Sequence, residues 1–64
     1  MSQPVFRAPD GTEVQVISID GLAQYRVRKG GVWQGISQPD GHRRNPTTIE
    51  ELGTLVDLAE LEAA

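Results

Sequence analysis

The chain has 64 residues, a formal net charge of −3, no cysteine and one histidine. A chain this short buries only ~60% of the surface that its unfolded form exposes, so we expect one small domain (residues 1–64) with a thin core. Only three residues are aromatic, so that core must be mainly aliphatic. The missing cysteines exclude disulfides and thiolate metal sites, and one histidine argues against an all-protein zinc site.

The first residues, Met1-Ser2-Gln3-Pro4, have neither the basic nor the apolar region of a signal peptide, and no apolar run is long enough to span a membrane. We therefore predict a cytoplasmic protein, or a module of a larger one, that does not contact membranes. A chain without cysteine is also compatible with secretion.

Charge is distributed unevenly along the chain. Residues 21–44 contain five basic residues and one acidic residue, whereas residues 45–64 contain five acidic residues and no basic one. This separation of a basic middle from an acidic C-terminal part is more informative about binding partners than the small net charge.

Residues 1–11 form an N-terminal segment in which Pro4 and Pro9 bracket Val5-Phe6-Arg7. Pro9-Asp10-Gly11 has the composition of a turn. Because proline is tolerated at sheet edges, a short extra edge strand at residues 5–7 is compatible with this pattern.

Residues 12–37 are predicted to form a three-stranded antiparallel meander. Asp20-Gly21 and Gly30-Gly31 are dipeptides typical of two-residue hairpin loops, and each is flanked by alternating apolar residues. They predict strands at about residues 12–19, 22–29 and 32–37. In this register Glu13 opposes Arg28, which in turn opposes Trp33, and Tyr25 opposes Ile36.

This register divides the side chains between two unlike faces. One face is aliphatic and contains Val14, Val16, Ala23, Tyr25, Val27, Val32 and Ile36. The other face contains Glu13, Gln15, Gln24, Arg26, Arg28 and Trp33, with Ile17, Ile19 and Leu22 at one end. A slip of one residue would exchange the faces, so the agreement between the two turns supports the register.

Residues 38–46 are predicted to be a basic loop and residues 47–62 a C-terminal helix. Thr48 and Glu51 have the spacing of a capping box. Ile49, Leu52, Val56, Ala59 and Ala63 form an apolar stripe that would cover the aliphatic sheet face. The expected fold class is therefore α+β, a two-layer β-β-β-α arrangement.

Two leucines of this helix, Leu58 and Leu61, lie outside the apolar stripe. They either cover Phe6 at the rim of the core or form a second interface.

The best candidate site is the polar sheet face together with the basic loop. Its candidate residues are Gln15, Gln24, Arg26, Arg28, Lys29, Trp33, His42, Arg43 and Arg44. Guanidinium groups beside an aromatic ring can bind phosphates and stack on bases, and glutamines can read adenine in the major groove. The structural alternative is that Arg28 stacks on Trp33, Glu13 pairs with Arg28, and the loop is merely solvated. The Trp33 face would be lost if Val5 and Phe6 folded over it.

No catalytic pattern is visible. His42 follows Asp40, but no serine or cysteine nucleophile accompanies them, and Gly30-Gly31 lacks the helix and Lys-Ser/Thr of a phosphate-binding loop. We therefore predict a non-enzymatic interaction module without cofactor or metal, which binds a protein partner through the Arg/Trp face and the two extra leucines. DNA binding through the same face and His42–Arg44 is the alternative, and the sequence leaves the oligomeric state open.

Overall fold

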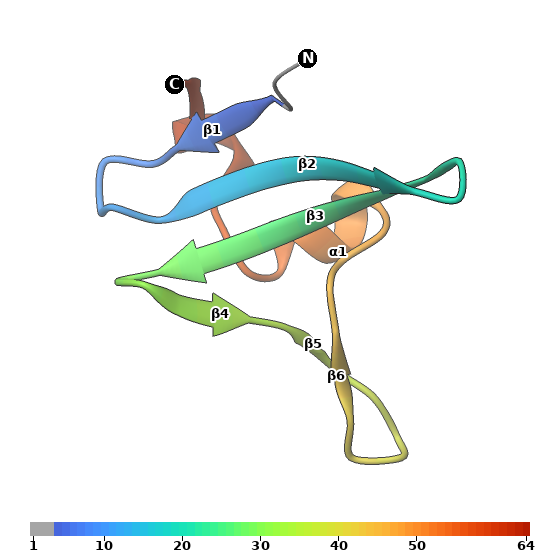
Figure 1. The fold of residues 1–64 in the computed structure, drawn as a ribbon. Coiled ribbons are helices and arrows are strands. Elements are labelled where there is room, and N and C mark those ends of the chain that lie inside the picture. The colour runs from blue at the N-terminus through green and yellow to red at the C-terminus, as the bar shows by residue number, and fades with distance from the viewer. Residues whose placement is uncertain (1–3) are drawn as a thin grey trace.

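The computed structural model describes residues 4–64, so residues 1–3 of the predicted N-terminal segment lie outside the described part. The elements in chain order are β1 (Val5–Arg7), β2 (Glu13–Ile19), β3 (Leu22–Lys29), β4 (Val32–Gln34), β5 (Ile36–Ser37), β6 (Arg43–Arg44), α1 (Ile49–Gly53), the 3₁₀ helix η1 (Leu58–Glu60) and β7 (Glu62–Ala63). Figure 1 shows α1 against one face of a twisted sheet, from which the β5–β6 hairpin projects. This arrangement is a small α+β fold.

The predicted hairpins and their register are confirmed. β2 pairs antiparallel with β3, and β3 with β4, in the predicted register, so that Arg28 faces Glu13 on one side and Trp33 on the other. Both hairpin loops have positive φ at their two central residues: 53° and 77° at Asp20-Gly21, and 59° and 80° at Gly30-Gly31. This is the backbone of a type I′ turn, whose twist matches that of the strands.

The prediction of a continuous third strand over residues 32–37 is wrong. β4 ends at Gln34, the chain bends at Gly35, and Ile36–Ser37 pairs with Arg43–Arg44 in a separate two-stranded sheet. The Tyr25–Ile36 pair is therefore not formed, and the Tyr25 N–H donates instead to the Pro46 carbonyl over 2.9 Å. Part of the predicted basic loop is consequently a β-hairpin that stands away from the main sheet.

The prediction of one helix over residues 47–62 is also wrong. Thr48 caps α1 as predicted, because its hydroxyl oxygen accepts from the Glu51 N–H over 3.1 Å, but the helix ends at Gly53. The Thr54 hydroxyl donates to the Glu51 carbonyl, and Asp57 caps the separate helix η1 by accepting from the Ala59 N–H. Glycine and such local side-chain bonds both compete with helix continuation, which explains the early end.

The end of the chain joins the sheet, which has the order β4-β3-β2-β1-β7. The extra N-terminal strand is present as β1, but it is not an edge, because β7 pairs with it through Phe6–Ala63 and Arg7–Glu62. The Ala64 N–H also donates to the Val5 carbonyl over 2.9 Å. The predicted meander thus forms one side of a five-stranded sheet among the described residues, with β4 at its edge.

The core lies between the aliphatic sheet face and the α1–η1 segment. Its buried apolar residues are Ala8, Val14, Val27, Leu52 and Val56, and the partly buried Phe6, Tyr25, Leu55 and Leu61 pack against them. Five residues expected in the apolar layer are instead exposed: Ala23, Val32, Ile49, Ala59 and Ala63. A helix of five residues is too short to cover the whole sheet face.

Candidate functional site

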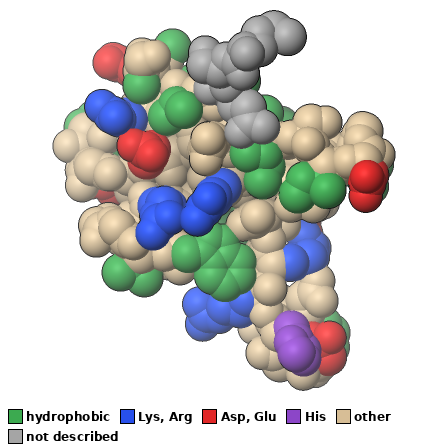
Figure 2. All heavy atoms as spheres, in the orientation of Figure 1, with side chains coloured by type: hydrophobic (Ala, Val, Ile, Leu, Met, Phe, Trp, Pro, Cys, Tyr) green, Lys and Arg blue, Asp and Glu red, His purple; other side chains and the backbone are tan. Residues whose placement is uncertain are grey.

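The opposite sheet face, which no helix of residues 4–64 covers, carries the predicted polar residues of β2–β4. We call Arg26, Arg28 and Trp33 of this face, together with Arg43 of β6, the Arg/Trp face. In Figure 2, Lys and Arg side chains gather around a hydrophobic patch in the middle of this view, and most of the acidic side chains lie toward its periphery. Phe6 packs into the core on the other side of the sheet, so it does not cover Trp33. Trp33 keeps 38% of its surface exposed.

The Trp33 ring is held in one position by Gly35 and Asn45. A Cβ atom on Gly35 would lie 2.6 Å from Cη2 and 2.7 Å from Cζ2 of the ring, so the indole lies directly on the glycine backbone. The indole Nε1–H donates to Oδ1 of Asn45 over 2.6 Å, and Asn45 Nδ2 is 3.4 Å from Oε1 of Gln24. This contact and these hydrogen bonds hold an exposed aromatic surface in a fixed orientation.

Arginines surround this aromatic surface without being neutralised by acids. Arg28 opposes Trp33 across the β3–β4 pair, and its Nη2 donates to the Gly31 carbonyl over 3.0 Å. Arg26 lies on the same face and forms no hydrogen bond or ion pair with any described residue through its side chain. Arg43 reaches the same place from β6, because its Cβ would lie 3.0 Å from a Cβ at Gly35. It likewise has no acidic partner among residues 4–64.

Glu13 opposes Arg28 as predicted, but the ion pair between them that the structural alternative assumed is not formed. The Glu13 carboxylate instead lies 3.3 Å from Nε of Arg7, on the other neighbouring strand. Gln15 opposes Arg26 in the sheet as predicted. Glu13 therefore pairs with Arg7 at the margin of this face, and it does not neutralise the guanidinium of Arg28.

Lys29 does not belong to the Arg/Trp face. It pairs with Val32 and alternates with Arg28 along β3, so it points to the other side of the sheet. Its Nζ lies 4.0 Å from Oδ2 of Asp10. The pKa of Asp10 is lowered, chiefly because its carboxylate accepts from the Thr12 N–H over 2.8 Å.

The three residues of the predicted basic tip, His42–Arg44, have different surroundings. The backbone of His42 is held at the hairpin turn by a bond from its N–H to Oδ1 of Asp40. Arg43 lies beside Gly35, against which the Trp33 ring packs. Arg44 forms a two-pronged ion pair with Glu51 at the start of α1, with Nη1 3.0 Å from Oε1 and Nη2 on Oε2. Arg44 therefore fastens the hairpin to the helix and is not free for a ligand.

The Glu51 carboxylate also accepts from the N–H and hydroxyl of Thr47, at 3.1 and 3.0 Å. Arg44, and then the Thr47 N–H, lower the pKa of Glu51 from its ordinary value of 4.5 to about 2. The pair is partly exposed, so salt screens it.

Gly35 and Asn45 are the residues that the sequence reasoning missed. Asn45-Pro46 was interpreted only as an extended approach to the helix, and Gly35 as an ordinary position of a strand. Gly35 lies two residues after Trp33, on the same side of the predicted strand, and this is a signal of close approach, because isolated glycines in strands mark bends or crowded backbone.

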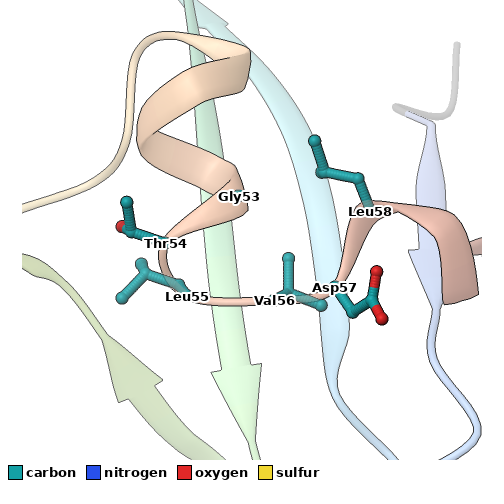
Figure 3. Close-up of a pocket in the computed structure, with 6 residues that line it drawn as sticks. All are labelled: Gly53, Thr54, Leu55, Val56, Asp57 and Leu58. Atoms are coloured by element: carbon teal, nitrogen blue, oxygen red, sulfur yellow. The ribbon is translucent and has the colours of Figure 1, made fainter.

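Two hollows elsewhere on the molecule are lined by few ionisable or nucleophilic side chains. An apolar cavity of about 250 Å³ lies under α1 and η1 and is lined by Phe6, Val14, Val16, Tyr25, Ile49, Leu52, Leu58 and Leu61. A shallower hollow follows the α1–η1 turn from Gly53 to Leu58 (Figure 3), where Asp57 is the ionisable residue and already caps η1. In the described part of the chain, no group of three or more His, Cys, Asp or Glu residues could hold a metal ion.

Leu61 packs against the core, so the structure places this predicted interface residue inside the fold, and Leu58 lines the apolar cavity at its rim. Within residues 4–64, no helix has the length and apolar character needed to span a membrane. Comparison of the chain with family models, curated proteins and solved structures finds no match.

Proposed function

We propose that this chain is a non-enzymatic interaction module that binds an acidic segment of a partner protein through the Arg/Trp face. The observation that carries the proposal is the rigid, exposed indole of Trp33 beside two arginines, Arg26 and Arg43, that have no acidic partner among residues 4–64. Aromatic anchors and arginines dominate the energetics of protein interfaces. An aromatic ring fixed before binding loses little conformational entropy when the partner arrives.

The charges on this side of the molecule favour a carboxylate-bearing partner. Three other basic side chains, Arg7, Lys29 and Arg44, already form ion pairs with acidic residues within the fold. Guanidinium groups without such a partner can form charge-assisted, two-pronged hydrogen bonds with carboxylates. A short acidic segment would complement Arg26, Arg28 and Arg43 and would pack its aliphatic stems on the indole.

DNA binding is the second candidate, favoured by the same exposed ring, on which a base could stack. It ranks lower because the cationic footprint is small. Proteins that bind duplex DNA tightly commonly contact about 6–10 phosphates, whereas this face offers three arginines, and the molecule as a whole carries a charge of −3.

The test is an amide NMR titration of the whole chain with two probes. One is a helical peptide of glutamate and alanine, with its glutamates in the first turn, and the other is a mixed-sequence DNA duplex. Both are added at about 50 and about 200 mM salt, a range over which DNA binding weakens steeply. We expect the peptide to shift amides around Arg26, Trp33 and Arg43, and we expect little change with DNA.

The variants Arg26→Ala and Arg43→Ala should each weaken peptide binding, and Trp33→Ala should weaken it by about tenfold or more. Lys29→Ala is the matched control, because it removes the same charge from the opposite side of the sheet. An equal effect of Lys29→Ala would mean that only net charge matters. Tight, salt-dependent binding of the duplex that needs Arg26 and Arg43 would replace the protein partner with DNA.

A further inference from the structure

The β2–β3 hairpin ends in two large aliphatic side chains that are exposed to solvent. Ile19 and Leu22 oppose each other next to the turn and keep 49% and 69% of their surface exposed. Ile17, one pleat further from the turn, points to the same side. We call Ile17, Ile19 and Leu22 the hairpin patch.

The hairpin patch shares a sheet face with the Arg/Trp face. Leu22 and Arg28 are an even number of residues apart on β3, and alternate residues of a strand point the same way. Figure 2 shows hydrophobic side chains both at the centre of this view and over the β2–β3 hairpin, with an acidic side chain at the hairpin's far end. Six residues of extended strand place Leu22 about 20 Å from Arg28.

The fold itself gives no reason for these exposed aliphatic residues. The core cluster lies on the other face of the sheet and contains neither Ile19 nor Leu22. By contrast, the exposed Ile49 lies at the rim of the apolar cavity and so borders the core. Exposed aliphatic groups on the same sheet face as an exposed aromatic ring are typical of an interaction surface.

We propose that the acidic partner segment also carries aliphatic residues, and that it binds as one amphipathic helix along this face, with its acids on the Arg/Trp face and its aliphatic side chains on the hairpin patch. This inference rests on the function proposed above and extends it. It adds the three residues of the hairpin patch to the contact surface, and it predicts which end of the partner helix is acidic.

A helix fits this surface better than an extended strand does. A strand adds to a sheet at its edge, where backbone groups are unpaired, whereas a helix satisfies its own backbone bonds and can lie on a face. About 13 helical residues span 20 Å at 1.5 Å per residue. Acidic residues in the first turn of such a helix would also suit its dipole.

The charge at the hairpin end disfavours a partner that is anionic along the whole face. Asp20 forms the turn directly beyond Ile19 and Leu22. A phosphate chain or an anionic lipid surface would meet this carboxylate where the aliphatic residues are. A partner with acids at one end and aliphatic residues at the other avoids that repulsion.

The experiment compares two helical peptides of about 14 residues. Both carry glutamates in the first turn; one has leucines at helical spacing in its last two turns, and the other, the peptide used above, has alanine at those positions. The whole chain is titrated with each peptide by NMR and by Trp33 fluorescence. We expect the leucine peptide to bind about tenfold more tightly, because partial burial of two or three leucines supplies that gain, and it alone should shift Ile19 and Leu22.

The variant Leu22→Ser should weaken the leucine peptide by about fivefold, the value expected for one partly buried leucine, and should leave the alanine peptide unaffected. Ile49→Ser is the matched control, because it removes a similarly exposed aliphatic residue from the other layer, and it should change neither affinity. Both positions are exposed, so neither substitution threatens the fold.

Three outcomes would overturn the inference. They are equal affinity for the two peptides, equal weakening of both peptides by Leu22→Ser, and weakening of the leucine peptide by Ile49→Ser, which would place it in the apolar cavity. In each case binding of the alanine peptide at Arg26 and Trp33 would leave the proposed function standing. If neither peptide shifts the Arg/Trp face, the proposed function itself fails.

Discussion

The indole Nε1–H of Trp33 donates to Oδ1 of Asn45 over 2.6 Å, and this bond ties the edge strand β4 to the segment that follows β6. The same segment is fastened on both sides of Asn45. Arg44, the residue before Asn45, pairs with Glu51, and the carbonyl of Pro46, the residue after it, accepts from the Tyr25 N–H. The orientation of the exposed ring therefore depends on residues about a dozen positions away in the chain.

The first prediction concerns this bond. Asn45→Ala removes the acceptor for the indole and should lower the free energy of unfolding by about 0.5–1.5 kcal/mol, the usual range for one hydrogen bond. The ring should also become more mobile, which fluorescence anisotropy of Trp33 can measure. Gln24→Ala is the control, because it removes only the weaker, second link at 3.4 Å. An effect of Gln24→Ala as large as that of Asn45→Ala would contradict this assignment.

The second prediction concerns the glycine under the ring. Gly35→Ala places a methyl group 2.6 Å from Cη2 of Trp33, so either the ring or the backbone must move. We expect a loss of about 1–3 kcal/mol in unfolding free energy, as in other overpacked sites, and a red-shifted Trp33 emission. Gly53→Ala is the matched substitution, since its Cβ would meet Leu58 at an ordinary 3.5 Å in a helix. It should be neutral or stabilising by up to about 1 kcal/mol.

Local signals in the sequence were sufficient to predict how β2, β3 and β4 pair. Two hairpin dipeptides and strict alternation predict the cross-strand register, in which Glu13 opposes Arg28 and Arg28 opposes Trp33, and this register is confirmed. Turn type and alternation depend on neighbouring residues alone, so they can be recognised without knowing the rest of the fold. The placement of Arg26, Arg28 and Trp33 on one face follows from them.

The C-terminal part could not be predicted in this way, because its structure depends on distant residues. The spacing of Leu52 and Val56 suits a helix, and both are buried, but β1 has an open edge that Glu62–Ala63 fills. Strand pairing at that edge overrides weak helix propensity after Gly53. The contact of Arg43 with the Trp33 site likewise depends on the bend at Gly35, which alternation cannot reveal.

The third prediction is a pH dependence due to Glu51. Its pKa is lowered from 4.5 to about 2 in the folded protein, so the ionised form stabilises the fold above about pH 4.5 and this stabilisation is lost as the pH falls toward 2. Glu51→Gln should be less stable than the parent at neutral pH, and the two should converge in acid. The measurement is the urea midpoint as a function of pH.

Asp10 also has a lowered pKa and contributes in the same pH range, so Asp10→Asn serves as a comparison. Because the Arg44–Glu51 pair is partly exposed, added salt should reduce the difference between parent and Glu51→Gln. Parallel decline of the two proteins from neutral pH into acid would show that Glu51 is not the group responsible.

The fourth prediction tests which helix residue supports the core. Leu52 is 3% exposed, whereas Ile49, which the sequence pattern placed in the same apolar stripe, is 54% exposed. Leu52→Ala should cost about 2–5 kcal/mol, the range for buried leucines, and Ile49→Ala less than about 1 kcal/mol. Chemical unfolding of both variants checks this order. Similar losses of unfolding free energy in the two variants would favour the longer amphipathic helix that the sequence pattern predicts.

The fifth prediction concerns the last strand of the sheet. The Ala64 N–H donates to the Val5 carbonyl over 2.9 Å, beside the Phe6–Ala63 pair. Ala64→Pro removes this donor, which should cost about 1 kcal/mol, and should speed hydrogen exchange of the β1 amides more than those at the centre of β3. Ala64→Ser keeps the N–H and is the matched control, with exchange rates close to those of the parent. If Ala64→Pro leaves β1 exchange unchanged, β7 does not protect that edge, and the sheet would end at β1 as the sequence suggested.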